Sequence, residues 1–363
     1  MWEQTKEHST MTSNQKRNLL IDTLIFEIDG VLIDVSKPSY QAIIQTIELF
    51  FTRGLGFLYK DRPSILIDQN DIDSLRMAGG LGNDWEISTT FISYFLEMLP
   101  PVDLTTQPLR KHVPDILAYL QIAGSKLRVS MDVLKKNKNI PRLARQISKA
   151  GGGLNGVDKV LKRRNRHLLS TGTDPLTGNL IQRIFQELYF GERLFEKIYD
   201  QKAIVVQTPG LISQETLLID PKVLKKLASH LTLAIATERP RPESEYTLRR
   251  FGIHHYFQTI ITYNDIVESG ATGKPAPWLL QQVVKLMEPR PTYCAYIDRI
   301  SDGILAAKHA SQTAPFITIG SLAASRDKQQ SRRHFEKSKA DIILGHPNQL
   351  ERVIFRSTTH RGR

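Results

Sequence analysis

From about residue 215 onward, short apolar runs alternate with stretches of helical periodicity, and this alternation limits the possible folds more than any other feature. The apolar runs are too short for helices and are typical of buried strands. They lie at residues 232–237, 259–262, 293–297 and 314–319. Helical patterns precede or separate them at residues 223–231, 241–251, 278–287 and 303–310. Strands that alternate with helices predict a three-layer, Rossmann-like α/β core with a parallel sheet covered on both faces.

The first strand of this core is predicted far from the others in sequence. Residues 19–26 form an apolar run that leads into Glu27-Ile28-Asp29-Gly30, whereas residues 92–199 have a mostly helical pattern. We therefore predict a split core of residues 19–36 and 215–363, with residues 37–214 inserted as a mostly helical cap. Residues 1–18 are polar and lack the apolar centre of a signal peptide, so they are predicted to be a disordered tail.

The positive charge of the chain is concentrated in the predicted cap. The net charge is +12, and residues 110–168, with 15 Lys or Arg and 3 Asp, account for all of it. This basic extension, about residues 102–168, favours an anionic partner such as nucleic acid, acidic lipid, an acidic protein or a phosphorylated ligand. A solvated helical surface is the alternative, since the segment has few aromatic residues and no nucleic-acid-binding motif.

The cysteine content and the length of the apolar runs bear on the compartment of the protein. Cys294 is the only cysteine, which excludes an internal disulfide and indicates a reducing compartment, so a cytoplasmic protein is expected. The apolar runs stay well below the roughly 18 residues that a membrane span requires. We therefore predict no membrane span.

Polar side chains stand at or after the ends of the predicted strands, where open parallel sheets place ligands. They are Glu27, Asp29, Thr237, Asp298 and Asp302, together with Lys274 in a loop before a helix. Carboxylates suit a hard cation such as Mg²⁺, and a hydroxyl and an ammonium group would bind phosphoryl oxygens. Asp29 could donate a proton to a leaving group and take one from water. The set predicts phosphate-ester chemistry.

The order of these pieces resembles the haloacid dehalogenase (HAD) superfamily. The resemblance rests on Glu-Ile-Asp-Gly after an apolar run, a strand ending in Thr237, Gly-Lys-Pro at Lys274, and Asp-x-x-x-Asp from Asp298 to Asp302. The helical insertion after the first motif is similar to that of subfamily I of the superfamily. The resemblance implies a Mg²⁺-dependent phosphatase that acts on a small phosphate monoester.

The resemblance also implies a role for each residue. The first acid, here Glu27, would be the nucleophile, Asp29 the acid and base, Thr237 a phosphate ligand, and Lys274 a neutralising charge. Glu27, Asp29, Asp298 and Asp302 would form the metal set. Each has a structural alternative: Asp29 and Asp298 as loop caps, Thr237 as a turn residue or helix cap, Lys274 as a solvated lysine, and Asp302 as a helix N-cap.

Three departures from the family pattern surround the predicted site. Glu27 stands where the family has aspartate, Ile297 where it usually has glycine, and Glu238 where a related branch has glycine. The extra methylene of Glu27 moves its carboxylate by roughly 1–1.5 Å, and a displacement of about 1 Å can cost on the order of 100-fold in rate. Weakened or absent phosphatase activity is therefore expected.

Further candidates for substrate binding are Asn83 and Trp85 in the cap and Arg239 in the run Thr-Glu-Arg-Pro-Arg. Their structural alternatives are a turn at Asn83, core packing of Trp85, and a solvated helix start at Arg239. Two other functions stay open. One is a non-catalytic HAD-fold protein that holds an anionic partner on its basic cap, and the other is phosphomutase or dehalogenase chemistry on the same frame.

Overall fold

The computed structural model describes residues 21–60, 65–81, 83–102, 112–162, 164–169, 178–206 and 209–355. Its contacts divide the chain into two compact units, one of residues 1–35 and 216–363 and the other of residues 36–215. We call the first the core unit and the second the helical unit. The predicted tail, residues 1–18, lies outside the described residues.

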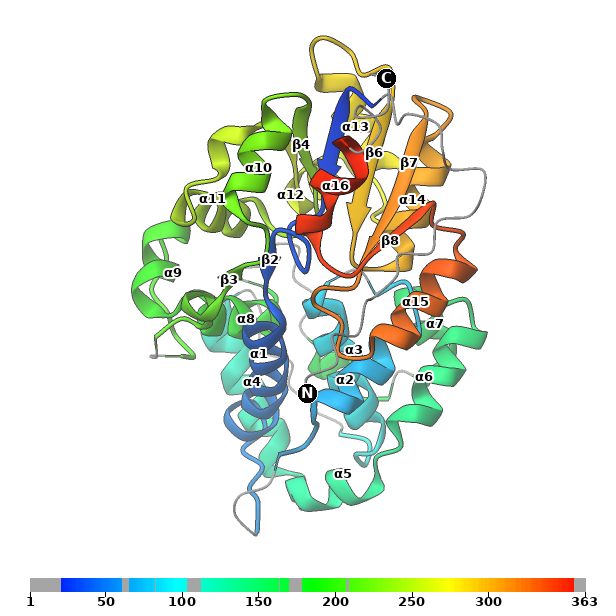
Figure 1. The fold of residues 1–363 in the computed structure, drawn as a ribbon. Coiled ribbons are helices and arrows are strands. Elements are labelled where there is room, and N and C mark those ends of the chain that lie inside the picture. Colours follow the sequence, from blue (N-terminus) through cyan, green and yellow to red (C-terminus); the bar gives the residue numbers. More distant parts are fainter. Residues whose placement is uncertain are drawn as a thin grey trace, which may run out of the picture. The chain divides into compact units, whose positions relative to one another are not determined.

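The core unit is built on one six-stranded sheet with the order β5-β4-β1-β6-β7-β8, in which every neighbouring pair is parallel (Figure 1). The strands are β1 (Thr23–Phe26), β4 (Thr232–Ala236), β5 (Phe257–Ile261), β6 (Cys294–Asp298), β7 (Phe316–Ser321) and β8 (Ile342–Leu344). The first strand in sequence lies at the centre, with Phe26 opposite Ile235 on one side and Ile297 on the other. The predicted parallel α/β core is confirmed.

Alternate residues of the strands face opposite sides of the sheet, so the core unit has two main apolar clusters. Leu24, Phe26 and Ile297 pack on one face with helices α10, α11 and α16, and Ile25 and Tyr296 pack on the other with α12, α13 and α14. These helices are α10 (Pro221–Ala228), α11 (Arg241–Arg250), α12 (Tyr263–Ser269), α13 (Trp278–Leu286), α14 (Ser301–Ala310) and α16 (Leu350–Phe355), and α15 (Lys328–Lys337) lies between β7 and β8.

A short antiparallel ribbon stands where the chain leaves the core unit and returns to it. Strand β2 (Ile33–Asp34) pairs with β3 (Thr216–Leu217), and the Leu218 amide donates to the Leu32 carbonyl at 2.8 Å. Ile33 and Leu217, 184 positions apart in the chain, are thereby held side by side, which allows a large insertion without interrupting the sheet.

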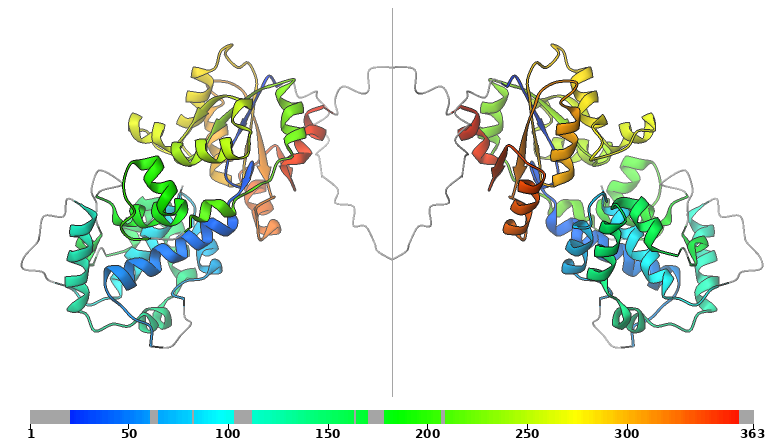
Figure 2. Two further views of the ribbon diagram at one scale, coloured as in Figure 1. Left: turned by 90° about the vertical axis from the view of Figure 1, so that its left-hand side faces the viewer. Right: turned by 90° about the vertical axis from the view of Figure 1, so that its right-hand side faces the viewer.

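The helical unit contains no β-strand among its described residues. Its α-helices are α1 (Ser36–Leu49), α2 (Gln69–Arg76), α3 (Asp84–Glu97), α4 (Val113–Ser125), α5 (Met131–Asn137), α6 (Ile140–Lys149), α7 (Gly153–Val160), α8 (Leu180–Phe190) and α9 (Glu192–Tyr199). Helix α8 packs against α1, α3, α4 and α9, and all of its residues except Gln182 are buried. Figure 2 shows these helices from two further sides.

Buried charge within α8 fixes the following loop. Glu187 forms an ion pair with Arg183 at 2.5 Å and also accepts backbone hydrogen bonds from Ile204, Val205 and Val206 at 2.6–2.9 Å. A buried carboxylate is stable only when its oxygens are paired in this way. Glu187 therefore ties the chain after α9 to the centre of the helical unit.

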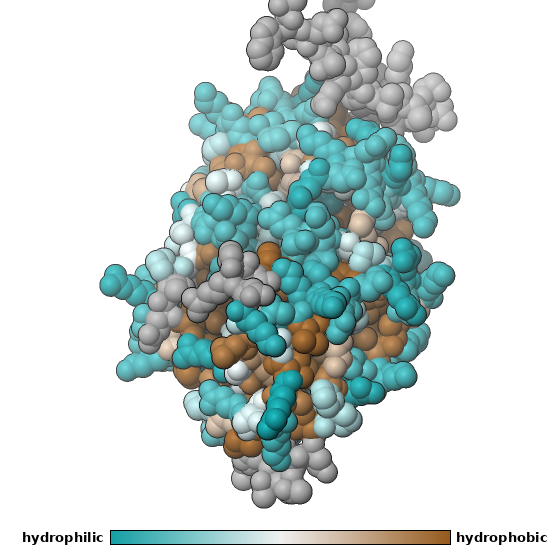
Figure 3. All heavy atoms as spheres, turned by 90° about the horizontal axis from the view of Figure 1, so that it is seen from below, coloured by the Kyte–Doolittle hydropathy of each residue, from teal (hydrophilic) through white to brown (hydrophobic). Residues whose placement is uncertain are grey.

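The basic extension is a solvated surface in its described part. Of the twelve described Lys and Arg residues between residues 112 and 168, eleven are exposed, and Lys138 is partly buried beside Asp71. Figure 3 shows a face of the molecule on which hydrophobic atoms lie among hydrophilic ones. Among the described helices, none combines the length and apolar character needed to cross a lipid bilayer.

Candidate active site

The parallel register of the sheet brings four of the predicted residues to one place in the core unit. Glu27 follows β1, Thr237 follows β4, and Asp298 is the last residue of β6, so all three stand at the carboxyl ends of adjacent strands. Lys274 lies in the connection between α12 and α13. All four are nearly or fully buried, with exposures of 0–7%.

Direct contacts join these four side chains into one network. One oxygen of Glu27, Oε1, accepts hydrogen bonds from the Thr237 hydroxyl and from the Ile28 amide at 2.8 Å. The other oxygen, Oε2, accepts from the Lys274 ammonium, which also donates to Asp298 Oδ2 at 2.7 Å. The ammonium group therefore lies between two buried carboxylates.

Tyr296 belongs to this network, although it was not among the predicted site residues. Its hydroxyl lies 2.7 Å from Asp298 Oδ2 and 3.2 Å from the Ala236 carbonyl oxygen, and Asp298 Oδ1 accepts from the Ile300 amide at 3.0 Å. Tyr296 is fully buried and stands two residues before Asp298, on the same face of β6. A hydroxyl-bearing residue in that position, in an otherwise apolar strand, was the signal that could have found it.

Burial and charge set the protonation of the network. Burial alone lowers the pKa of Lys274, but the Asp298 and Glu27 carboxylates outweigh it and raise that pKa well above its usual value. Burial raises the pKa of Glu27 against the opposing effect of Lys274. Burial and the Asp298 charge raise the pKa of Tyr296 well above its usual value. At neutral pH Lys274 is therefore a cation and Tyr296 is neutral.

The Asp29 side chain pairs with Arg239, while its backbone amide donates to Glu27 Oε1 at 3.4 Å. The Arg239 guanidinium donates to Asp29 Oδ1 at 2.9 Å and to the Thr247 hydroxyl at 2.9 Å, and it lies 3.7 Å from a Glu243 carboxylate oxygen. Arg239 is only 4% exposed, so the alternative of a solvated helix start is wrong. The cost of burying a guanidinium explains why it is surrounded by acceptors.

The other two departures from the family pattern, Glu238 and Ile297, have local structural roles. The Glu238 carboxylate accepts a hydrogen bond from the Lys274 amide at 2.6 Å, so it fixes the lysine loop. A Cβ at Gly273 would overlap this carboxylate, which explains the glycine before Lys274. Ile297 directs its side chain into the apolar cluster with Leu24, away from Asp298, because adjacent strand residues alternate.

Helix α14 packs directly behind Asp298. A Cβ at Gly303 would overlap Asp298 Oδ2, so the close approach of this helix requires glycine. The helix begins at Ser301 after Ile300 as N-cap, which places Asp302 in the first turn and makes the N-cap alternative for Asp302 wrong. Thr237 is no helix cap either, because Pro240 precedes α11. The Thr237 hydroxyl oxygen accepts a hydrogen bond from the Arg239 amide at 3.1 Å.

The remaining two predicted residues belong to the helical unit. Asn83 is the N-cap of α3, and its side-chain oxygen accepts from the amides of Trp85 and Glu86 at 3.1 and 2.9 Å. The Trp85 ring stands edge-on to Phe185, with ring centroids 6.3 Å apart. Both side chains thus have structural roles within this unit.

The Glu27 and Asp298 carboxylates, which were predicted to bind Mg²⁺, are already hydrogen-bonded within the network. All four oxygens of Glu27 and Asp298 accept hydrogen bonds from described groups, and Lys274 occupies the position between the two carboxylates. In the part of the chain that the structure describes, no three or more His, Cys, Asp or Glu side chains are grouped to hold a metal ion. As arranged, these residues do not fit a magnesium site.

Comparisons with known proteins agree with the fold. Residues 218–314 match the family of haloacid dehalogenase-like hydrolases, a segment that includes Thr237, Lys274 and Asp298 but not Glu27. No curated protein sequence is detectably similar to the chain.

Two solved structures are similar over most of the chain. An X-ray structure from the Northeast Structural Genomics Consortium has 17% identity over 92% of this chain and 98% of its own, with a TM-score of 0.57. Phosphatase Tt82 from Thermococcus thioreducens has 20% identity over 84% of this chain and 93% of its own, with a TM-score of 0.50. The chain therefore has a haloacid dehalogenase-like fold, in which residues 218–314 are similar in sequence to the haloacid dehalogenase-like hydrolases.

Proposed function

We propose that this protein is a phosphatase homologue that hydrolyses small phosphate monoesters slowly. The reaction would be slow because the Glu27 carboxylate is hydrogen-bonded to the two side chains that would otherwise bind the phosphoryl group. One observation carries the proposal: the Glu27 carboxylate accepts hydrogen bonds from both the Thr237 hydroxyl and the Lys274 ammonium. These are the two donors that would bind phosphoryl oxygens. The match of residues 218–314 to a hydrolase family supports the reaction class.

The residues of the core unit would act in the following order. Thr237 and Lys274 donate to the phosphoryl oxygens, and a Glu27 oxygen attacks phosphorus. The ester oxygen leaves with a proton from Asp29, which produces the alcohol and a glutamyl-phosphate. Water, deprotonated by Asp29, then releases inorganic phosphate and restores Glu27.

The same contacts explain why this reaction would be slow. Thr237 and Lys274 must leave the Glu27 carboxylate before they can bind a phosphoryl group. In addition, the extra methylene displaces the attacking oxygen by about 1–1.5 Å, and about 1 Å of misplacement costs on the order of 100-fold in rate. The local charge also opposes an anionic substrate, since Glu27 and Asp298 share the single ammonium of Lys274.

Magnesium was the cofactor expected from the sequence, but the hydrogen bonds of Glu27 and Asp298 leave no fitting site for it as the residues are arranged. A hard cation would have to displace Lys274 from at least one of them. The proposed steps use only the side chains of the protein. Assays with and without Mg²⁺ show whether the reaction requires the ion.

The test compares the wild-type protein with Glu27→Asp and Asp29→Asn on a panel of small phosphate monoesters, with and without Mg²⁺. We expect slow release of phosphate by the wild type, about 100-fold faster release by Glu27→Asp, and none by Asp29→Asn. Equal rates of phosphate release by the wild type and Glu27→Asp would show that Glu27 is not the cause of the slow reaction. If neither form releases phosphate under any condition, the protein is not a phosphatase.

A second candidate function rests on the exposed cations of the helical unit. Lys135, Lys136, Lys162 and Arg164 are all exposed, and Arg163, predicted with them, lies outside the described residues. An anionic macromolecule held there would bind without turnover and would dissociate as salt is raised. Retention of the full chain on heparin should fall when these four residues are replaced by Gln. Replacing the core-unit residues Lys222, Lys225 and Lys226 should have little effect.

A further inference from the structure

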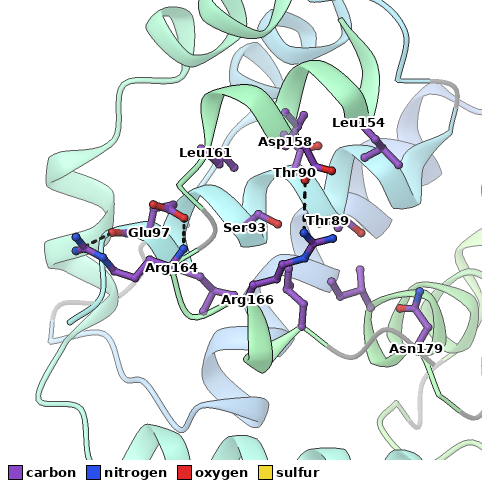
Figure 4. Close-up of a pocket in the computed structure, with 14 residues that line it drawn as sticks. Thr89, Thr90, Ser93, Glu97, Leu154, Asp158, Leu161, Arg164, Arg166 and Asn179 are labelled. Carbon is purple, nitrogen blue, oxygen red and sulfur yellow. Dashed lines mark hydrogen bonds and ion pairs between the residues drawn. The ribbon is translucent and has the colours of Figure 1, made fainter. Parts of the chain in front are cut away.

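The helical unit encloses a cavity of about 370 Å³ that has no part in the proposed phosphatase reaction (Figure 4). It lies between α3, α7, the start of α8 and the segment around the short helix η2 (Arg166–Leu168). Cavities of roughly 300–1,000 Å³ accommodate small organic molecules, and this one is at the lower end. The described residues that line the cavity all belong to this one compact unit.

Apolar side chains form one side of the cavity. Leu96 of α3, Leu154 of α7 and Leu161 line it, and Leu154 is 43% exposed. Two close backbone approaches hold α7 here. The Gly153 amide donates to the Gly79 carbonyl at 2.8 Å, and a Cβ at Gly156 would lie 2.9 Å from the Ile147 carbonyl oxygen. These contacts fix where the helix that carries Leu154 packs in the unit.

Hydroxyl groups line another side. Thr89 and Ser93 are four residues apart on α3, so they lie on one face of this helix. Ser88 and Thr90 donate to backbone carbonyls of their own helix at 2.8 and 2.7 Å. The hydroxyls of Thr89 and Ser93, in contrast, make no hydrogen bond to another described residue. They are available to a bound molecule.

Arg166 brings a cation to the same cavity. Its only ion pair within the described parts of the chain is with Asp158 at 4.0 Å, beyond hydrogen-bonding distance, and both side chains are 44–45% exposed. Figure 4 shows the Arg166 side chain extended along the cavity toward Asp158. Glu97 is occupied, because it accepts from the Arg164 amide at 2.5 Å. Among the described residues, no acceptor lies within hydrogen-bonding distance of the Arg166 guanidinium.

We propose that this cavity binds a small amphipathic carboxylate. The planar guanidinium of Arg166 matches a carboxylate in a bidentate arrangement, Ser93 and Thr89 supply additional donors, and the leucines cover an apolar body. Two arginines and two acids line the cavity, so its net charge is near zero. A monoanion is favoured over a phosphate dianion, which Asp158 and Glu97 would repel.

The experiment measures binding of octanoate to the full chain by isothermal titration calorimetry. Octanol and octylamine keep the apolar body and change the head group, whereas acetate keeps the carboxylate alone. We expect one octanoate per chain, at least about tenfold weaker binding of octanol and octylamine, and no binding of acetate. Octanol that binds as well as octanoate, or an absence of octanoate binding, would overturn the proposal.

Two variants and a control locate the site. Arg166→Gln, at a half-exposed position, should weaken octanoate binding about tenfold, whereas Arg145→Gln removes the same charge from an exposed position outside the cavity and should not. Ser93→Leu removes one donor and narrows the cavity, so it should also weaken octanoate binding. Equal affinities of Arg166→Gln and the wild type would contradict the assignment. The assay uses no phosphate ester, so failure of the phosphatase proposal leaves it intact.

Discussion

The network around Glu27 in the core unit and the cavity beside Arg166 in the helical unit contain similar chemical groups in opposite states. In the core unit, the cation and both carboxylates are buried and pair with one another. In the helical unit, Arg166 is half exposed, its partner stands 4.0 Å away, and two hydroxyls make no bond within the described residues. The comparison teaches that a polar cluster whose hydrogen bonds are already made must release its partners before it can bind a ligand, whereas a cluster with unused donors can bind one directly.

The largest expected effect concerns access to the core unit. Cys294 is fully buried on β6, and burial raises the pKa of its thiol to about 12. Since the thiolate is the reactive form, labelling by a disulfide reagent at pH 8 should be at least about 1,000-fold slower in the native protein than in urea. Ser93→Leu, a change in the other unit, should leave this rate unaltered. Rapid labelling of the native protein would contradict a closed core.

Removing the cation of the network is expected to have the next largest effect. Lys274→Met leaves Glu27 and Asp298 buried without a counter-ion, which should cost about 3–5 kcal/mol of unfolding free energy in urea titrations. Millimolar Mg²⁺ should restore part of this loss, because a divalent cation could then reach both carboxylates. The exposed Lys222→Met is the control. A loss of unfolding free energy below about 1 kcal/mol would mean that Lys274 does not stabilise the buried Glu27 and Asp298 carboxylates.

A smaller effect is expected at the helix behind Asp298. Gly303→Ala adds a Cβ that overlaps Asp298 Oδ2, and the forced shift should cost about 1–3 kcal/mol, although alanine is the better helix former. Urea unfolding measures this cost, and Ser301→Ala in the same helix should stay within about 0.5 kcal/mol of the wild type. Stabilisation by Gly303→Ala would show that α14 is not tightly packed on Asp298.

The smallest effect separates a structural from a substrate-binding role for Asn83. Asn83→Ala removes the N-cap of α3 and should lower the unfolding free energy by about 1 kcal/mol, whereas Asn83→Ser should retain most of it. In the Glu27→Asp background, the KM for a phosphate ester should be the same for both variants. A raised KM in Asn83→Ser at unchanged stability would instead support a contact with substrate.

Much of the fold was predictable because its strands are marked by local patterns. The apolar run at residues 232–237 extends one residue beyond the end of β4. The run at residues 293–297 begins and ends one residue before β6. The run predicted at 259–262 ends earlier because Thr262 caps α12 through a capping box with Asp265. Strand β8 was not predicted, since three residues, Ile342–Leu344, are too few for a periodic signal.

The sequence predicted which residues form the candidate site better than it predicted the hydrogen bonds between them. Strand ends that meet at one edge of a parallel sheet brought Glu27, Thr237 and Asp298 together, as the order of motifs indicated. The roles of Tyr296 and Arg239 were not evident, because a buried tyrosine in a strand and an arginine before a helix are common in other contexts. Only the tertiary structure shows that the Tyr296 hydroxyl reaches Asp298 and that the Arg239 guanidinium reaches Asp29.

The sequence by itself determined the parallel sheet and the acidic, hydroxyl and lysine groups at its edge, because periodicity and strand order are local properties that survive without coordinates. Only the tertiary structure decided that Lys274 lies between two carboxylates, that Glu238 holds a backbone amide, and that Arg166 faces a cavity. A hydrogen bond is made or lost over differences of a few tenths of an ångström in the distance between groups far apart in the chain, and packing sets those distances.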